Sequence, residues 1–191
     1  MELLAGVGHD LDHGQGGKAL GAAGGVIGGG DLHQVHRHHL AGLADGLQHI
    51  RDVLEIKAKG IDLSYINYAD KDILVIADAE QLKRVINNII GNSLKYMDKK
   101  HGIINIRLLD VGDFVQIEIE DNGKGIGQKE LPYIFDRFYR TDSSRNSSKG
   151  GSGIGLSIVK KIIEDHGGKI WATSKEGIGT EIHFVLRKIG V

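Results

Sequence analysis

Four polar or charged residues recur at helical spacing in the segment that follows Asp78. They stand at i, i+4, i+7 and i+8, so a helix would gather them on one strip of its surface: Asn88, Asn92, Lys95 and Tyr96. Asparagine is unfavourable inside a helix, and Gly91, between the two asparagines, adds a cost of about 1 kcal/mol relative to alanine. A helix that keeps such residues is expected to use them in binding, although a solvated polar face would show the same spacing.

An acidic side chain follows the strand-like run 114–120 and opens the sequence DNGKGI. This residue, Asp121, would stand at the end of a strand, where its carboxylate can accept a hydrogen bond from the amino group of a ligand. The glycines after it carry no side chain and leave room for a flat ring. An ordinary Asn-Gly turn is the alternative interpretation.

The sequence KGGSGIGLS, residues 149–157, has three glycines at every second position: Gly151, Gly153 and Gly155. Their backbone N–H groups can approach an anion closely. The loop is not a Walker A loop, because Leu156 follows the last glycine, and it lacks the third glycine of a dinucleotide fingerprint. Apolar spacing after it predicts a helix from 152 or 153 to about 166, whose N-terminus would favour negative charge. We therefore expect an anion site here.

These residues need a sheet and helices to hold them. Alternating or apolar runs predict strands at 61–68, 73–77, 103–109, 114–120, 169–173 and 180–186. A helix is predicted over 79–97, capped by Asp78, with six apolar residues on its buried face: Leu82, Val85, Ile86, Ile89, Ile90 and Leu94.

Pro132 is expected to open a short helix that continues to about residue 140. Two phenylalanines and two arginines share this segment: Phe135, Phe138, Arg137 and Arg140. The phenylalanines are expected in the core, and the arginines are available to a phosphate. The polar run 141–148 has no apolar anchor and is interpreted as a lid or a linker.

The whole chain of 191 residues carries a formal net charge of −1 and no cysteine. This charge gives no field that would recruit nucleic acid or a membrane surface. The lack of cysteine excludes disulfides and thiolate metal sites and fits a reducing compartment such as the cytoplasm. The longest apolar stretch, 19–30, is short and half glycine, so we expect neither a membrane span nor a signal peptide.

Composition changes near residue 50, because residues 1–50 hold 13 of the 29 glycines and 7 of the 10 histidines. Glycine disfavours helices, so irregular structure is expected up to about Leu40, followed by a helix from Ala41 to near Gly60. The histidine cluster at 33–39 is interpreted as a solvated run rather than a metal site, since acidic neighbours are sparse. A frame error, a fusion or a designed replacement would each produce such a change in composition.

Taken in order, the motifs resemble the catalytic ATP-binding domain of sensor histidine kinases, in the Bergerat-fold superfamily that includes Hsp90, gyrase B and MutL. The similar segments are NNIIGNSLKY (N box), DNGKGI (G1 box), IFDRFYR (F box), GGSGIGLS (G2 box) and GTEIHF (the last glycine box). The resemblance covers roughly residues 45–188. It implies an α+β fold, a two-layer α/β sandwich in which a mixed, mostly antiparallel sheet packs on about three helices. We expect an irregular or helical arm at 1–42, a degenerate dimerisation region, and the catalytic domain at 43–191.

The resemblance also implies a role for each matching residue. Asp121 would bond the adenine amino group, with Gly123 and Gly125 shaping the base pocket. Asn88 and Asn92 would hold Mg²⁺ on the phosphates, while Lys95 and Tyr96 would contact phosphate or ribose. The glycines Gly151, Gly153 and Gly155 would cradle the phosphates under the 141–148 lid. The boxes add further nucleotide-binding residues: Ile126, Arg137, Ile154, Leu156 and Thr180.

Two departures limit the implied activity. Hydrolytic members of the superfamily place a glutamate at the first N-box position, whereas this chain has Asn88, which is no general base at neutral pH. Slow hydrolysis and transfer to a histidine are therefore expected, with Asn88 and Lys95 among the catalytic residues. The nearest match to a phosphoacceptor box is His9, but no proline follows it and a chance match is favoured.

The implied partners are ATP, a response regulator receiver domain and a histidine phosphoacceptor domain in cis or in trans, with a homodimer as the usual assembly. No nucleic-acid partner is expected. A nucleotide-binding module without autokinase activity is the alternative function, and a serine kinase of the anti-sigma type on the same fold is a third. The chain would be cytoplasmic, as the cytoplasmic portion of a sensor.

Overall fold

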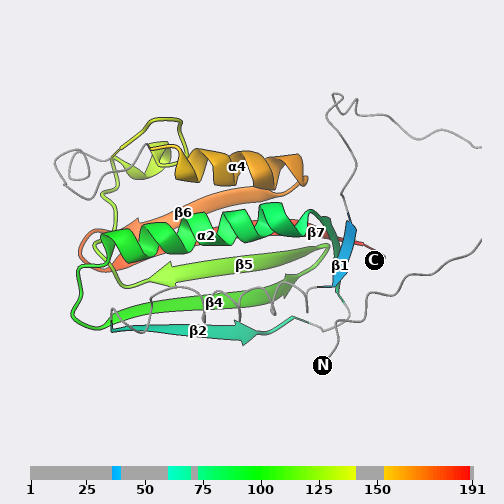
Figure 1. Ribbon diagram of the computed structural model, residues 1–191, viewed down its shortest axis with the longest axis horizontal. Coiled ribbons are helices and arrows are strands. Elements are labelled where there is room, and N and C mark those ends of the chain that lie inside the picture. Colours follow the sequence, from blue (N-terminus) through cyan, green and yellow to red (C-terminus); the bar gives the residue numbers. More distant parts are fainter. Residues whose placement is uncertain (1–35, 40–59, 70–72, 141–152, 190–191) are drawn as a thin grey trace, which may run out of the picture. The chain divides into compact units, whose positions relative to one another are not determined.

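A computed structural model describes residues 36–39, 60–69, 73–140 and 153–189, all within the compact unit His33–Val191. Seven strands form one sheet in the order β1-β3-β7-β5-β4-β2, with β6 also paired to β7 (Figure 1). The strands are β1 (His36–His39), β2 (Ile61–Asn67), β3 (Leu74–Ala77), β4 (Gly102–Val111), β5 (Phe114–Asp121), β6 (Lys169–Lys175) and β7 (Gly179–Ile189). Among these strands only β2 and β4 pair in parallel, so the sheet is mixed and mostly antiparallel, as predicted.

β7 is the strand that holds the sheet together. Along one edge it pairs with β5 over eight residues, in a register that places Thr180 opposite Asp121. It also pairs with β6 over its first seven residues and with β3 at its last two. The end of β5, which carries Asp121, therefore lies next to the start of β7.

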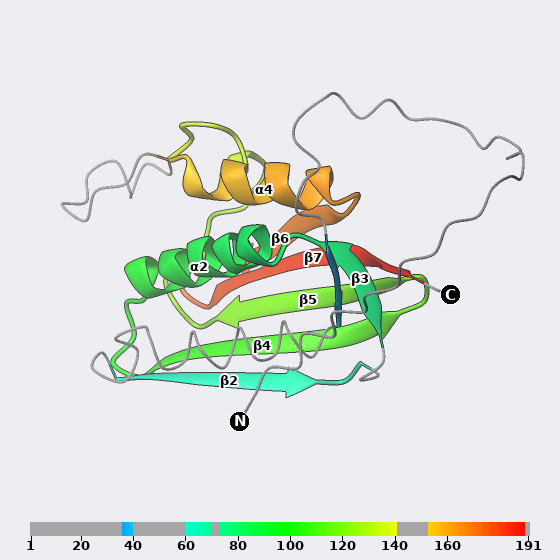
Figure 2. The same cartoon turned by 45° about the vertical axis from the view of Figure 1, so that its right-hand side comes forward.

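Two helices cover one face of this sheet, α2 (Ala79–Tyr96) and α4 (Gly155–Asp165) (Figures 1 and 2). Alternate residues of the central strands point to that face because side chains alternate along a strand. They are buried together: Ile104, Ile106 and Leu108 on β4, Val115, Ile117 and Ile119 on β5, and Ile182, Phe184 and Leu186 on β7. The predicted buried face of α2 packs on them, with five of its residues buried and Leu94 partly buried against the same core.

The two helices are linked at one end. Asp78 caps α2 as predicted: its carboxylate accepts hydrogen bonds from the N–H groups of Glu80 and Gln81 at 2.9 and 3.1 Å. The Asp78 N–H donates to His166 Nε2 at 2.9 Å, just beyond the end of α4. His166 Nδ1 lies 2.7 Å from the Ile162 carbonyl, to which it donates. The start of α2 and the end of α4 are thus held to each other.

The face of the sheet without these helices is polar at its centre. Arg107 on β4 donates from Nε to Glu118 Oε2 and from Nη1 to Glu120 Oε2, each at 2.8 Å, and from Nη2 to Glu181. The hydrogen bonds with Glu118 and Glu120 raise the pKa of Arg107. One guanidinium therefore joins β4, β5 and β7.

The segment after Pro132 differs from the prediction. A 3-10 helix, η2, spans only Leu131–Tyr133, and turns follow it instead of a continued helix. Phe135 packs against the core as expected. Phe138, also predicted to be buried, is 71% exposed and has a φ of 63°. Without a continuous helix, a spacing of three residues does not place both rings on one face, so the prediction for Phe138 was wrong.

β1 lies inside the segment 1–42, where irregular structure was expected up to about Leu40. It pairs antiparallel with β3. Pairing with β3 accounts for a strand at a position where the local sequence does not predict one. The helix predicted from Ala41 to Gly60 and the lid at 141–148 lie outside the described residues. The domain boundary after residue 42 stays a prediction.

Candidate functional site

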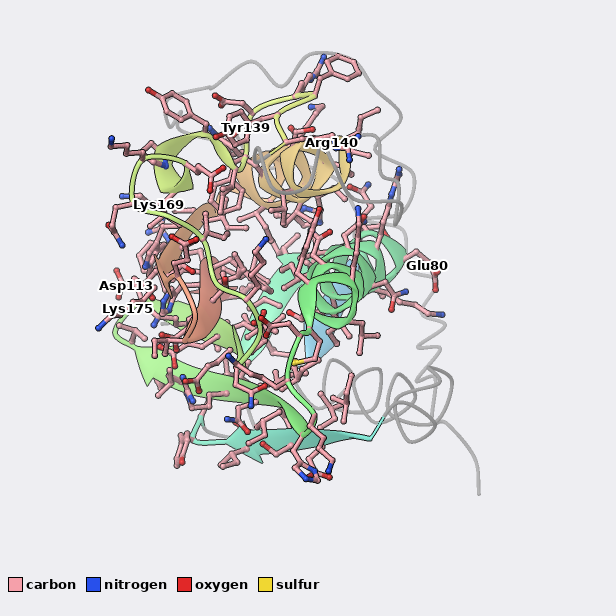
Figure 3. The ribbon with its side chains drawn as sticks, turned by 90° about the vertical axis from the view of Figure 1, so that its left-hand side faces the viewer. Glu80, Asp113, Tyr139, Arg140, Lys169 and Lys175 are labelled. Atoms are coloured by element: carbon pink, nitrogen blue, oxygen red, sulfur yellow. The ribbon has the colours of Figure 1, made fainter. Side chains whose placement is uncertain are left out.

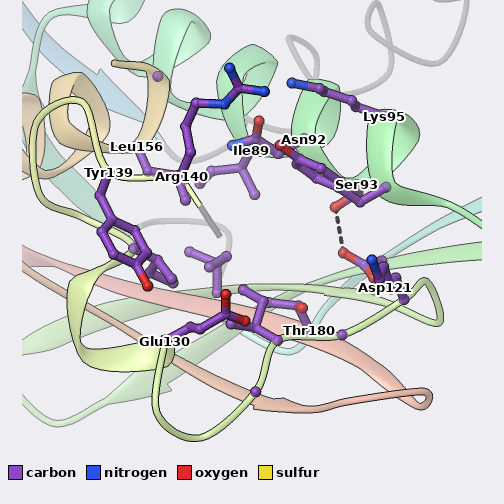
Figure 4. A pocket seen from close by; sticks show the side chains of 18 of the residues that line it. Ile89, Asn92, Ser93, Lys95, Asp121, Glu130, Tyr139, Arg140, Leu156 and Thr180 are labelled. Atoms are coloured by element: carbon purple, nitrogen blue, oxygen red, sulfur yellow. Dashed lines mark hydrogen bonds between the residues drawn. The ribbon is translucent and has the colours of Figure 1, made fainter. Parts of the chain in front are cut away.

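A cavity of about 400 Å³ opens between the helices and the ends of the central strands (Figure 4). Its walls come from α2, the end of β5, the segment 124–130, the residues just before the 141–152 segment, the N-terminus of α4 and the start of β7. This volume is within the range of small-molecule sites, about 300–1,000 Å³.

Asp121 stands at one end of the cavity in a fixed orientation. Its Oδ2 accepts a hydrogen bond from the Ser93 hydroxyl of α2 at 2.7 Å, and its Oδ1 accepts from the Gly123 N–H at 2.9 Å. Both bonds leave acceptor capacity on an ionised carboxylate, which has about four lone-pair sites. Asp121 can therefore accept a further hydrogen bond from a ligand while its position is held by the protein.

The DNGKGI loop is tied to both sides of the cavity. Its Lys124 N–H donates to the Tyr96 carbonyl at the end of α2, and the Lys124 carbonyl accepts from Gly177 N–H in the β6–β7 turn, at 3.2 and 2.7 Å. Gly125 has a φ of 71°, and an added Cβ would lie 2.1 Å from the Lys175 carbonyl oxygen. Only glycine fits this close approach to β6, and the predicted role of Gly125 in shaping the base pocket stays a prediction.

At the opposite end the glycine loop leads into α4. Gly153 has a φ of 68°, and its carbonyl accepts a hydrogen bond from Phe138 N–H at 3.0 Å. Gly155, the first residue of α4, lies so close to Asn88 that an added Cβ would be 3.1 Å from Asn88 Oδ1. The start of α4, which lines the cavity through Gly155, and the Asn88 amide oxygen are therefore neighbours, and the N–H groups of the first helical turn favour negative charge there.

Charge is distributed between two sides of the cavity. Figure 4 shows Arg140, Asn92 and Lys95 along one side and Asp121, Thr180 and Glu130 along the other. In Figure 3 Arg140 lies beside α4. A ligand with an anionic part and a hydrogen-bond-donating ring would match this distribution.

The structure brings most of the predicted site residues into this one cavity. Ten of them line it: Asn92, Lys95, Tyr96, Asp121, Gly125, Ile126, Gly153, Gly155, Leu156 and Thr180. Asn88, Gly123, Arg137 and Ile154 are not among the lining residues, although Asn88 lies beside Gly155 and the Gly123 N–H donates to Asp121. His9 and Gly151 lie outside the described residues. Of the two arginines of the F box, it is Arg140 that reaches the cavity.

Sequence reasoning missed several lining residues, among them Ser93, Glu130 and Tyr139. A signal for Ser93 was present, because it stands four residues after Ile89 on the buried face of α2, where a small polar residue needs a hydrogen-bond partner. Glu130 and Tyr139 belong to an irregular segment, where no periodicity indicates which side chains face a ligand.

Residues 77–189 match the family described as histidine kinase-, DNA gyrase B-, and HSP90-like ATPase. The match covers more than half of the chain, from the end of β3 to the end of β7, and includes the whole cavity. The chain belongs to this ATPase family. The resemblance seen in the sequence is thereby confirmed.

The ATPase domain is similar to parts of longer sensor kinases. It is 41% identical over 121 residues to the sensor histidine kinase WalK of Bacillus subtilis (strain 168), covering 63% of this chain and 20% of that protein. It is 39% identical over 134 residues to the sensor protein kinase WalK of Staphylococcus aureus, covering 69% of this chain and 32% of that protein. The chain thus spans about a fifth to a third of the length of these curated relatives.

Solved structures share the fold. The catalytic domain of histidine kinase ThkA, in a nucleotide-free form, superposes with a TM-score of 0.67 at 27% identity, covering 81% of this chain and 96% of that one. The mycobacterial sensor histidine kinase MprB gives a TM-score of 0.66 at 27% identity, covering 80% and 98%. The predicted fold class is confirmed. Neither α2 nor α4 combines the length and the hydrophobicity that crossing a bilayer requires, and no other described helix does.

Proposed function

We propose that this chain is the ATP-binding catalytic domain of a two-component sensor histidine kinase, in the cytoplasmic portion of that sensor. It would transfer the γ-phosphate of ATP to a protein histidine for relay to a response regulator. The observation that carries the proposal is the cavity itself, in which a preoriented Asp121 faces, across the site, a side formed by Asn92, Lys95 and Arg140.

The two ends of the cavity suit the two ends of ATP. Asp121 would accept a hydrogen bond from the adenine amino group. Gly125 lets its loop pack closely against the end of β6, and the ring would lie in the space beside this loop. Lys95, Arg140 and the N-terminus of α4 would receive the phosphates, because cations and free backbone N–H groups both favour negative charge.

Mg²⁺ fits the amide oxygens of α2. Asn88 Nδ2 donates to the Arg84 carbonyl at 2.8 Å, which fixes the amide and directs its oxygen toward the start of α4. Asn92 lies one helical turn further on the same strip and lines the cavity. Asn88 and Asn92 would hold the ion, which binds oxygen ligands together with substrate phosphates and neutralises their charge.

Phosphoryl transfer in this site would depend on positioning and electrostatics. Asn88 cannot act as a general base, so activation of water is disfavoured relative to transfer to an imidazole brought to the γ-phosphate. The acceptor would stand on a phosphoacceptor domain in cis or in trans, in a protein that is commonly a homodimer. A ThkA structure that aligns at 25% identity contains the response regulator TrrA, which supports a receiver domain as the second partner.

The test compares Asp121→Asn with Asp62→Asn, a change at an exposed residue of β2. We expect Asp121→Asn to weaken ATP binding at least about tenfold, since a hydrogen bond to a charged group contributes about 1.5–3 kcal/mol, and Asp62→Asn to leave it unchanged. With γ-labelled ATP, Mg²⁺ and an added histidine-bearing dimerisation domain, the wild-type chain should transfer an acid-labile, base-stable label.

Each remaining outcome decides against part of the proposal. Equal ATP affinity of the Asp121→Asn variant and the wild type would contradict the assigned site. ATP binding without transfer to any added acceptor domain would favour a nucleotide-binding module. An acid-stable label would indicate a serine kinase. Label on the chain alone would make His9 or another histidine of the chain the acceptor.

A further inference from the structure

Three side chains on the face of the sheet opposite α2 and α4 form what we call the β5–β7 cluster: Glu118, Glu181 and His183. Each offers a ligand atom, and these atoms lie within 4.8 Å of one another. The β5–β7 register places Glu118 opposite His183, so the cluster is built on two paired central strands. We infer that the β5–β7 cluster binds a transition-metal ion of the zinc class, at a site separate from the ATP cavity.

The spacing of the donor atoms fits a metal better than it fits direct ion pairs. Glu118 Oε1 lies 3.5 Å from His183 Nδ1, and Glu181 contributes a third ligand atom within 4.8 Å of the other two. Charge-assisted hydrogen bonds are shorter, about 2.7–2.9 Å. Bonds of about 2.0–2.2 Å from one ion to nitrogen and oxygen at tetrahedral angles separate the donor atoms by about 3.3–3.6 Å.

His183 supplies the second, independent observation. It is 8% exposed, and its Nδ1 is buried and makes no hydrogen bond within the described part of the chain. Its Nε2 lies 3.3 Å from the Thr173 hydroxyl, which can accept the N–H of that nitrogen. A neutral imidazole that donates at one nitrogen and keeps the other as a ligand is the usual arrangement of a metal-binding histidine. Nδ1 is therefore the nitrogen that would bind the ion.

The local charge favours a cation. Three carboxylates, those of Glu118, Glu120 and Glu181, share the single guanidinium of Arg107, which leaves two formal negative charges. Arg107 bonds Glu118 Oε2 and Glu181 Oε1, so the other oxygen of each carboxylate is directed to the histidine. Glu118 Oε1 also accepts a hydrogen bond from the Gln116 amide at 2.7 Å. This bond uses one lone pair of the oxygen and leaves the second lone pair for an ion. Imidazole with carboxylate suits zinc, nickel or copper better than magnesium or calcium.

Trp171 makes the site measurable. Its ring stacks on His183 with centroids 5.2 Å apart and an interplanar angle of 6°, and it is the only tryptophan in the sequence. A paramagnetic ion at the cluster should therefore quench the fluorescence of the whole chain. The experiment titrates Ni²⁺ into the full chain and then adds Zn²⁺, which is diamagnetic. Seven histidines in residues 1–50 can also bind Ni²⁺. Variants of the cluster residues are therefore needed to show that the quenching comes from Ni²⁺ bound at the β5–β7 cluster.

We expect saturable quenching that Zn²⁺ reverses. His183→Gln and Glu181→Gln should each raise the apparent Ni²⁺ dissociation constant at least about tenfold, as loss of a metal-binding side chain does. His101→Gln, a matched change at an exposed histidine, should leave it unaltered. Glu181→Gln keeps the shape of the side chain, so it remains informative if His183→Gln unfolds. No quenching, or equal quenching in the wild type and the Glu181→Gln variant, would overturn the inference.

Discussion

The Asp121 carboxylate is held in place by the protein before any ligand is present. One oxygen accepts from Ser93 on α2 and the other from the Gly123 N–H of its own loop. A carboxylate fixed in this way loses little freedom when it binds, and such preorganisation increases affinity. If Asp121 binds ATP as proposed, the affinity for ATP should therefore depend on residues such as Ser93 that only orient this carboxylate.

Ser93→Ala removes the hydrogen bond to Asp121 Oδ2 and keeps the helix, because alanine is a good helix former. We expect ATP affinity to fall about three- to tenfold, since the carboxylate loses one of its two fixed bonds. Isothermal titration with ATP measures the change. The matched control is Ser64→Ala on β2, which removes a 2.6 Å hydrogen bond to Asn105 elsewhere on the sheet and should leave affinity unaltered. An unaltered affinity in the Ser93→Ala variant would contradict this role.

Gly125→Ala tests the close approach of the DNGKGI loop to β6 beside the cavity. An added Cβ would lie 2.1 Å from a backbone oxygen of β6, and the φ of 71° adds strain. We expect a loss of at least about tenfold in ATP affinity and a lower melting temperature, because the loop must shift. Gly112→Ala is the control, since its φ of 61° imposes similar strain but the space around it is open. Equal ATP affinities for these two variants would show that the contact is unimportant.

Residue types and spacing were sufficient to find the polar strip of α2, Asp121 and the glycines of the cavity. They failed where the outcome depends on three-dimensional geometry. Arg137 and Arg140 are equivalent in sequence, and only the turns after η2 direct Arg140 into the cavity. Ser93 was overlooked because it stands on the face of α2 assigned to the apolar core.

At the scale of elements, α2 carries the site, and its start is defined by one side chain. Asp78 accepts hydrogen bonds from two backbone N–H groups of the first turn. The bond from Gln81 is the main cause that lowers the pKa of Asp78 below its ordinary value of 3.8. A carboxylate with a lowered pKa in the folded state stabilises that state above its ordinary pKa, and this contribution is lost as pH falls through the lowered value.

Asp78→Ala should lower the free energy of unfolding by about 1 kcal/mol at neutral pH, the typical loss for a helix cap. The deficit should shrink at a pH well below 3.8, once the pH has fallen through the lowered pKa of Asp78 and the wild-type cap is protonated. Asp78→Asn keeps an acceptor that does not titrate, so its stability relative to wild type should improve on acidification. Urea unfolding at both pH values measures these differences. An Asp78→Ala deficit that is independent of pH would contradict the titration of the cap.

Elements with strong periodicity were predicted well. The helix expected at 79–97 is α2, and the six predicted strands correspond to β2 to β7. The exceptions are elements that depend on neighbours rather than on their own sequence. β1 is a strand because it pairs with β3. The turns after η2 follow a proline, which is compatible with either a helix or a turn.

At the scale of the whole molecule, Arg107 joins three strands on the face of the sheet opposite α2 and α4. Its hydrogen bonds lower the pKa of Glu120, with burial acting in the opposite direction. For Glu118 burial raises the pKa, but hydrogen bonds from Arg107 and Gln116 outweigh it and the pKa is lowered. Both carboxylates are therefore ionised and paired at neutral pH, and β4, β5 and β7 share one electrostatic link.

Arg107→Met should cost about 1–3 kcal/mol of unfolding free energy at pH 7, because three partly buried carboxylates lose their counter-charge. The lowered pKa values of Glu118 and Glu120 contribute stability that is fully present above the ordinary glutamate value of 4.5 and is lost as pH falls through the lowered values. The difference in unfolding free energy between the variant and the wild type should therefore narrow as pH falls below 4.5. Urea unfolding across this range measures the difference. Lys188→Met, which removes one contact of 2.8 Å with Asp110, is the control and should cost under about 1 kcal/mol. If the difference in unfolding free energy between the Arg107→Met variant and the wild type widened in acid, the stabilising role of these ion pairs would be contradicted.

The position of β7 has a consequence for how this protein is made. β7 follows the other strands in the chain, yet it joins β5, β6 and β3 within the sheet and supplies Thr180 to the cavity. A nascent chain stalled before residue 179 can form the β4–β5 hairpin with β2, but β6 and β3 still lack the strand that connects them to it. The sheet and the cavity would therefore be completed together, only once residues 179–189 have left the ribosome.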